Sequence, residues 1–293
     1  MNATLTNKSV TSVALIPFLK KVPAIARRFW LDTNGVQTNL SMLRGVWGLA
    51  LKSHEPQAYR EVFEGGTVQN DRKPHYILRP GPISGGYPSV EFLVFGNGTA
   101  FDANLIRAWK IAEALGLGPD RRPFMIVQTD FLNEDGDAVL GNAQKHFNLS
   151  QVSWPLAGDP ENTPCRIRFD LPLRIIRQGR LIERPALADL VQAGFKRLSN
   201  FLPPEDLPGL AWLRDQALVS ARTTVCEPFV GRSAGVVRYS GRQKVEVEMD
   251  GVVGELGFPN GLGCNWRILA AAQWLHLGKT TILGLGRPII SEV

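Results

Sequence analysis

Apolar and polar residues in the first half of the chain switch repeatedly between strand spacing and helix spacing. Apolar or alternating runs predict β-strands at 24–31, 75–79, 89–95 and 123–129, with a turn-rich stretch at 80–88. Apolar residues three and four apart predict helices at 38–52, 56–63 and 102–115. We expect Thr38 or Asn39 to cap the first helix, and Gly116 and Gly118 to end the last. The order β-α-β-β-α-β is that of a ferredoxin-like unit.

The same order recurs in the second half of the chain. Strand-like runs occur at 166–176, 221–229, 235–239, 244–249, 252–258 and 281–290. Helix-like runs occur at 185–201 and 262–275, and Asp250-Gly251 is a turn signal between two of the strands. The stretch 132–163 is rich in Asn, Asp, Gly and Pro, which places the domain boundary there. We therefore expect an α+β chain with two tandem ferredoxin-like (RRM-like, βαββαβ) domains, residues 1–150 and 151–293.

The charge of the chain narrows the kind of partner it can have. Its formal net charge is +6, and 23 of its 33 Lys and Arg residues are Arg. Arginine binds phosphate bidentately and stacks on bases, so the bias favours a phosphate-rich partner, although the codon usage of a GC-rich genome also produces it.

The three cysteines lie far apart, which argues against a disulfide framework or a cysteine-based zinc site. No run is long enough to span a membrane and no signal peptide is expected, so we predict a cytoplasmic protein.

Two short motifs in the second half lack the context that their chemistry needs. Gly278-Lys279-Thr280 ends like a phosphate-binding P-loop, but Gln273 stands where that motif needs glycine, and the preceding residues are helix-like. Gly231–Gly235 has the form G-x-S-x-G with Ser233 as nucleophile, but strand-like residues follow it where a helix is required. The four histidines have no metal-binding spacing, so we expect neither a metal nor a cofactor.

An ordered set of short motifs resembles one protein family. Tyr239–Val247, Gly251–Glu255 and Trp274–Arg287 resemble the C-terminal region of the CRISPR-associated repeat endoribonucleases, which belong to the RAMP superfamily. Further motifs in matching order are Leu43–Leu51, Pro74–Leu78, Glu91–Gly96, Ala114–Gly118 and Leu171–Arg174. Each motif is weak alone, and the resemblance rests on their order over most of the chain.

The resemblance implies a fold, a reaction and partners. The fold is two ferredoxin-like domains, with a glycine-rich loop at Gly278–Gly286 between the last helix and the last strand. The implied activity is a metal-independent endoribonuclease that cuts precursor CRISPR RNA within its repeats. In that reaction a ribose 2′-hydroxyl attacks the adjacent phosphate and leaves a 2′,3′-cyclic phosphate and a 5′-hydroxyl. The implied partners are the repeat RNA hairpin, the mature crRNA that the protein keeps, and other subunits of a CRISPR effector complex.

The sequence departs from the family at the expected catalytic position. The family often has a histidine just before a Glu-Val-like pair, and this chain has Arg60 there. Because arginine stays protonated in proteins, Arg60 would stabilise charge on the phosphate instead of acting as a base. Some branches of the family, including those of type IV systems, resemble this pattern. We predict that Arg44, Arg60 and Arg242 are the catalytic residues, with His54 as an alternative titrating group.

The predicted RNA contacts lie in the second domain. Glycines let backbone N–H groups approach phosphate closely, while lysine, arginine and threonine add charge and donors. The predicted contacts are Arg238, Lys244, Gly278, Lys279, Thr280, Thr281, Gly284, Gly286 and Arg287. Competing interpretations are a plain helix-to-strand connector for the loop, and a packed or surface residue for His75. If the arginines do not catalyse, the alternative function is a non-cleaving crRNA-binding scaffold of an effector complex.

Overall fold

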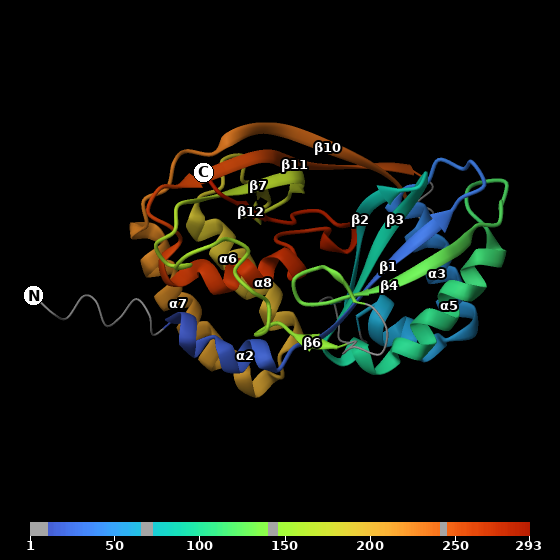
Figure 1. The fold of residues 1–293 in the computed structure, drawn as a ribbon, viewed down its shortest axis with the longest axis horizontal. Coiled ribbons are helices and arrows are strands. Elements are labelled where there is room, and N and C mark those ends of the chain that lie inside the picture. The colour runs from blue at the N-terminus through green and yellow to red at the C-terminus, as the bar shows by residue number, and fades with distance from the viewer. Residues whose placement is uncertain (1–10, 66–72, 140–145, 241–244) are drawn as a thin grey trace, which may run out of the picture. The chain divides into compact units, whose positions relative to one another are not determined.

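A computed structural model describes residues 11–65, 73–139, 146–240 and 245–293, with the backbone alone for 236–240 and 245–249. Contacts group the chain into two compact units, and Figure 1 labels their main helices and strands. Pro23–Phe147 form the N-terminal unit. The described parts of Met1–Val22 and Asn148–Val293 form the C-terminal unit.

The N-terminal unit follows the predicted β-α-β-β-α-β order. Its main strands are β1 (Pro23–Asp32), β2 (Tyr76–Ser84), β3 (Tyr87–Phe95) and β4 (Met125–Leu132), followed by the short β5 (Ala138–Val139) and β6 (Phe147–Asn148). Its helices are α3 (Leu40–His54), α4 (Pro56–Ala58), the π-helical η1 (Tyr59–Phe63), the 3-10 helix η2 (Gly96–Phe101) and α5 (Asp102–Leu115). As predicted, the Asn39 side chain caps α3 by accepting a hydrogen bond from the Met42 N–H, and Gly116, at φ +73°, ends α5.

The sheet of the N-terminal unit has the order β2-β3-β1-β4-β5, with β6 pairing β1 outside that order. The main strands pair antiparallel. Phe29 of β1 lies on the face that α3 and α5 cover, with its ring centre 5.4 Å from that of Trp109. Trp47 of α3 stacks on Trp109 of α5 at 5.6 Å. These aromatic rings form the core between the sheet and the two helices.

The stretch 80–88, expected to be a loop, instead belongs mostly to strands β2 and β3. Prolines are tolerated there because β2 is the edge strand of the sheet, where a missing N–H breaks no internal pairing. The pairing shifts register between Pro80 and Ile83, as in a β-bulge. Gly85 and Gly86, with φ of +58° and +82°, make the turn between the strands.

The C-terminal unit repeats the order β-α-β-β-α-β and adds further elements to it. Its strands are β7 (Cys165–Leu173), β10 (Val230–Ser240), β11 (Val245–Phe258) and β12 (Ile289–Ser291), with a small hairpin of β8 (Ile176–Arg177) and β9 (Arg180–Leu181). Its helices are α2 (Ile16–Lys20), α6 (Leu187–Leu198), α7 (Leu207–Thr223) and α8 (Trp266–Leu275). Short 3-10 turns are η3 (Ser199–Phe201), η4 (Pro204–Asp206), η5 (Gly263–Asn265) and η6 (Thr281–Leu283).

The antiparallel sheet of the C-terminal unit has the order β10-β11-β7-β12. Helices α6 and α8 cover one face of this sheet, and α7 packs on α6 (Figure 1). Both units therefore show the strand order of a ferredoxin-like fold, so the predicted fold class is confirmed. Helix α2 belongs to this unit, and its neighbour Lys21 forms an ion pair of 2.6 Å with Asp206.

Three local predictions in the C-terminal unit are wrong. The predicted strand at 221–229 is instead the end of α7 followed by irregular backbone, because Leu210, Leu213, Ala217 and Ala221 recur at helical spacing and are buried. The predicted turn at Asp250-Gly251 lies inside β11, where a Cβ on Gly251 would come within 2.7 Å of Pro172.

The third wrong prediction is the strand at 281–290, of which only Ile289–Ser291 is a strand. Thr280 and Gly284 have φ of +62° and +75°, and these left-handed residues curl the backbone into the 3-10 turn η6. In the part of the chain that the structure describes, none of the helices is both long and apolar enough to cross a membrane.

Candidate nucleic-acid interface

Arg44 lies on α3 with a half-buried side chain. Its Nε–H donates a hydrogen bond of 2.6 Å to the hydroxyl oxygen of Tyr76. Its guanidinium carbon lies 4.3 Å from the centre of the Phe63 ring, within the range of a cation–π contact. Arg44 is thus held by an aromatic ring and a neutral hydroxyl group.

Phe63 reaches Arg44 because α3 carries a glycine one turn later. A Cβ on Gly48 would lie 2.4 Å from the Phe63 ring, so only glycine leaves room for the ring against the helix. Phe63 is the last residue of η1, the π-helical segment that also contains Arg60. Such segments are frequent at functional sites. The structure therefore packs Arg44 against the segment that carries Arg60.

Arg60 is exposed on η1, whose backbone is fixed at its other end. The His75 N–H donates a hydrogen bond of 3.0 Å to the Val62 carbonyl, which ties η1 to the start of β2. Tyr59 stacks on Phe63 with ring centres 5.1 Å apart. A rigid support thus presents the Arg60 side chain to solvent.

Several other arginines of the N-terminal unit are neutralised by carboxylates. These ion pairs are Arg27–Asp102, Arg28–Glu91, Arg79–Glu91, Arg107–Glu55 and Arg122–Asp120. Among the described residues, no carboxylate forms an ion pair with Arg44 or Arg60. Withdrawing a cation from water without a counter-charge costs free energy. A half-buried, unneutralised Arg44 therefore has the electrostatics of an anion-binding group.

The two histidines near these arginines differ in exposure. His54 ends α3, is exposed, and has its Nδ1 3.3 Å from the Ala50 carbonyl, so proton exchange with a ligand would use Nε2. The hydrogen bond from Asn104 lowers the pKa of the adjacent Glu55 carboxyl, and Arg107 acts in the same direction. His75 is half-buried, and its Nδ1 lies 3.2 Å from the Phe95 carbonyl in the packed start of β2.

The glycine-rich loop follows α8 and is built on left-handed backbone. Positive φ angles occur at His276 (+57°), Gly278 (+83°), Thr280 (+62°), Gly284 (+75°) and Gly286 (+69°). A Cβ on Gly286 would lie 2.0 Å from the Leu277 carbonyl oxygen, and one on Gly278 would lie 2.4 Å from that of Arg174. These two glycines thus let the loop approach carbonyl groups of the protein itself.

Part of the loop is closed to a ligand. Backbone N–H groups of Leu283 and Gly284 donate to carbonyls within the loop, those of Thr280 and Thr281. The Leu277 N–H donates to the Gly286 carbonyl, and the Lys279 N–H donates to the Arg174 carbonyl outside the loop; all four bonds measure 2.8–3.1 Å. Thr281, Gly284 and Gly286 are buried, whereas Lys279 is exposed and Gly278, Thr280 and Arg287 are half-buried. The accessible part of the predicted RNA contacts in the loop is therefore Gly278–Thr280 and Arg287.

Two side chains fix the base of the loop. Arg197 of α6 is buried, and its Nε–H donates a hydrogen bond of 3.0 Å to the Leu275 carbonyl at the end of α8. Burial lowers the pKa of Arg197 to about 10, so the side chain stays charged at neutral pH. His276 is fully buried, with its Nδ1 3.2 Å from the Leu285 carbonyl. The loop is therefore anchored at both of its ends.

The predicted basic hairpin lies at β10 and β11. Arg238 is on β10, opposite Val247 of β11, whereas Arg242 and Lys244 lie outside the described residues. Ser233 lies within β10, with strand on both sides, so the strand–turn–helix context of a serine nucleophile is missing.

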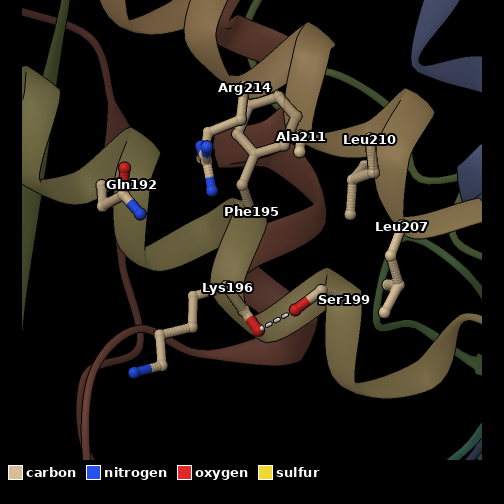
Figure 2. A pocket seen from close by; sticks show the side chains of 8 residues that line it. All are labelled: Gln192, Phe195, Lys196, Ser199, Leu207, Leu210, Ala211 and Arg214. Carbon is tan, nitrogen blue, oxygen red and sulfur yellow. Dashed lines mark hydrogen bonds between the residues drawn. The ribbon is translucent and has the colours of Figure 1, made fainter. Parts of the chain in front are cut away.

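A cavity of about 300 Å³ lies between α6 and α7 (Figure 2). Its lining residues are Gln192, Phe195, Lys196, Ser199, Leu207, Leu210, Ala211 and Arg214. It contains none of the predicted catalytic or RNA-binding residues. Within the described ranges, no cluster of three or more His, Cys, Asp or Glu side chains is placed to hold a metal ion.

The residues that support Arg44 were not predicted from the sequence. Tyr76 lies within the Pro74–Leu78 motif and Gly48 within Leu43–Leu51, but neither had been given a role in the site. Phe63 had been counted only as the end of a short helix. The sequence offered no sign of the contacts, since Arg44 and Tyr76 are 32 residues apart.

Comparison with known proteins agrees with the family resemblance and the fold. Residues 167–288 match the family model of CRISPR-associated endoribonuclease Cas6. The fold is similar to that of a Cas6 in a product complex (TM-score 0.58, 18% identity, covering 92% of this chain and 100% of that one). It is also similar to Thermus thermophilus Cas6 (0.56, 13%, 92% and 99%) and to part of a Cas6-RT-Cas1–Cas2 complex (0.56, 14%, 94% and 47%). No curated protein sequence matches the chain.

Proposed function

We propose that this chain, whose residues 167–288 match the family model of CRISPR-associated endoribonuclease Cas6, cleaves precursor CRISPR RNA within its repeats. The observation that carries the proposal is this family match, which includes the glycine-rich loop. The similarity in fold to a Cas6 in a product complex supports it over 92% of the chain. Placement in the type IV branch stays a prediction.

The proposed reaction is an attack by a ribose 2′-hydroxyl on the adjacent phosphate. A bond forms between the 2′ oxygen and phosphorus, and the bond from phosphorus to the 5′ oxygen breaks. The products are a 2′,3′-cyclic phosphate and a 5′-hydroxyl. Negative charge builds on the non-bridging oxygens as the phosphorus becomes five-coordinate, and fixed cations there lower the barrier.

We assign that charge stabilisation to Arg44, which contacts the Phe63 ring, and to Arg60, which lies on the same segment η1 as Phe63. Arginine cannot accept the proton of the 2′-hydroxyl, since it stays protonated. The proton therefore passes to water in this account, and the 5′ oxygen takes one from water. His54 is the alternative proton acceptor, and a His54→Ala variant that cleaves normally would dismiss it. Arg242 stays a predicted third cation.

RNA binding is assigned to the accessible loop residues and to the basic hairpin. Lys279 and Arg287 supply positive charge. Gly278 lets a phosphate approach the backbone closely, and Thr280 supplies a hydroxyl group. Arg238 and Lys244 stay predicted contacts for the stem of the repeat RNA, which a protein reads mainly through shape and backbone. The proposed partners are the repeat RNA, the retained mature crRNA and other CRISPR proteins.

The test is cleavage of the repeat RNA of the same genome by purified chain in EDTA. We expect products with a 2′,3′-cyclic phosphate and a 5′-hydroxyl, and no cleavage of RNA with a 2′-deoxy sugar at the cut site. Cleavage only after Mg²⁺ is restored would contradict metal independence, and cleavage of the deoxy RNA would contradict the mechanism. Tight binding with no cleavage under any condition would identify the chain as a crRNA-binding scaffold.

A further inference from the structure

Arg44 rests on an aromatic cluster that joins three elements of the N-terminal unit. The rings of Phe63 and Tyr76 stack with centres 5.5 Å apart and an angle of 18° between planes. The rings of Tyr76 and Trp47 form a T-shaped pair with centres 4.9 Å apart. Tyr76 is fully buried, and it belongs to β2 and hence to the sheet. The hydroxyl that Arg44 contacts is therefore attached to the sheet of the unit.

The contacts with Tyr76 and Phe63 constrain Arg44 in two directions. A guanidinium group is planar and carries five N–H donors, of which one is on Nε. The Nε–H donates to Tyr76, and no described residue accepts a hydrogen bond from the two Nη atoms, so their four donors remain for another group. The Phe63 ring, 4.3 Å from the guanidinium carbon, limits movement out of that position. The two Nη atoms form a fork that matches two oxygens of a phosphate.

The hydroxyl of Tyr76 also leaves the charge of Arg44 intact. A carboxylate at that point would fix the side chain equally well but would neutralise it, as Glu91 does for Arg28 and Arg79. A neutral acceptor fixes the geometry and keeps a full positive charge for an incoming anion. Gly48 belongs to the same arrangement, because it gives the Phe63 ring its place against α3.

We propose that Tyr76 and Phe63 are positioning residues, which hold Arg44 so that its Nη fork meets the scissile phosphate. The inference rests on the proposed function, since it assumes that RNA is cleaved and that Arg44 touches the reacting phosphate. Tyr76, being buried, acts through Arg44 and does not itself contact RNA. A group fixed before the reaction is more effective than one that must be ordered during it.

The test is a double-mutant cycle between Tyr76→Phe and Arg44→Ala, read out by single-turnover cleavage. Tyr76→Phe removes only the hydroxyl and keeps the ring. We expect it to slow cleavage by about 10-fold, while the Kd for uncleavable 2′-deoxy repeat RNA changes by less than about 2-fold. The double variant should be no slower than Arg44→Ala alone, because the hydroxyl acts only through Arg44. Tyr87→Phe, which alters an exposed tyrosine of β3, is the matched control and should cleave normally.

The outcomes separate this inference from the proposed function. If the wild type does not cleave, the proposed function is wrong and this inference fails with it. If the wild type cleaves and Arg44→Ala does not, but Tyr76→Phe matches the wild type, the inference alone is overturned. It is equally overturned if Tyr76→Phe slows the Arg44→Ala variant further by the same factor, since the effect would then be a general loss of structure.

Phe63→Leu covers the case in which Tyr76→Phe lowers the melting temperature. It removes the ring that contacts Arg44 and leaves an apolar side chain in its place. The same slowing, absent in the Arg44→Ala background, supports positioning. Slowing that persists in that background contradicts it.

Discussion

The glycine-rich loop and the face formed by α3 and η1 were both expected to meet RNA, yet they are built in opposite ways. In the loop, Gly284 and Gly286 are buried and amide groups such as that of Lys279 bond to carbonyls of the protein. On the α3–η1 face, Arg44 and Arg60 carry charge that no carboxylate of the described residues neutralises. The loop is thus mainly a packed structural element with Lys279 as an exposed cation, whereas the arginine face carries two arginines that no carboxylate of the described residues neutralises.

Glycines of the loop and arginines of the α3–η1 face therefore serve different physical purposes in this proposed RNA-binding protein. Glycine is required where backbone must come close to backbone, and here much of that backbone belongs to the protein. Cations without partners are required where a phosphate is to be held. Substitutions in the loop should therefore affect stability first, and substitutions on the arginine face should affect cleavage first.

The largest effect on stability is expected from Gly286→Ala. Its φ is +69°, and the new Cβ would lie 2.0 Å from the Leu277 carbonyl oxygen, so the loop must shift. We expect the free energy of unfolding to fall by on the order of 3 kcal/mol, measured by denaturant titration. Gly235→Ala is the control, since its Cβ meets only the Asp250 side chain at 3.5 Å. Equal stability of the two variants would contradict a packed loop.

Arg60→Ala should come next, with an effect on rate and little on stability. The side chain is exposed on η1 and solvent screens its charge, so we expect single-turnover cleavage to slow by about 10-fold. The melting temperature should stay within a degree or so of the wild type, since surface substitutions usually change stability by less than about 0.5 kcal/mol. Arg122→Ala, an exposed arginine paired with Asp120, should cleave normally. A normal rate for Arg60→Ala would remove it from the site.

Lys279→Ala should have the smallest effect of the series. Lys279 is the exposed cation of the loop, and losing one phosphate contact should weaken RNA binding by a few-fold. The slope of log Kd against log salt concentration should decrease by about 1. Binding of the 2′-deoxy RNA at several salt concentrations measures both quantities, with Lys110→Ala on α5 as control. An unchanged salt slope would exclude Lys279 from contact with phosphate.

Local pattern in the sequence was enough for most of the fold. Helix α5 has the bounds that its apolar spacing predicted, because Gly116 supplies the left-handed residue that ends it. The order of elements then fixed the fold class, since few topologies accommodate β-α-β-β-α-β. Helix α7 was not predicted, because Trp212 and Val219 are apolar but exposed and so obscure the helical spacing of its buried apolar residues. Asp250-Gly251 was misleading because a turn signal can also mark a close approach within a strand.

The site could be predicted only as far as residue type allows. Arg44 and Arg60 were identified as candidates from their chemistry and the family resemblance. Their support by Tyr76 and Phe63 depends on contacts between α3, η1 and β2, which no periodicity of the sequence contains. Whether a carboxylate neutralises a given arginine likewise depends on the tertiary structure. Arg27 and Arg44 look alike in sequence, and only the structure shows that Asp102 pairs with the first.

The most direct test of this account is the single-turnover rate of Arg44→Ala on repeat RNA, measured beside its melting temperature. We expect the rate to fall by about 100- to 1,000-fold, the range for loss of one fixed donor to a developing negative charge. The melting temperature should fall only slightly, since the variant loses the contacts with Tyr76 and Phe63 but leaves no carboxylate of the described residues without its partner. Arg107→Ala, which removes an arginine paired with Glu55, should retain the wild-type rate. A wild-type rate for Arg44→Ala in a folded protein would contradict the account.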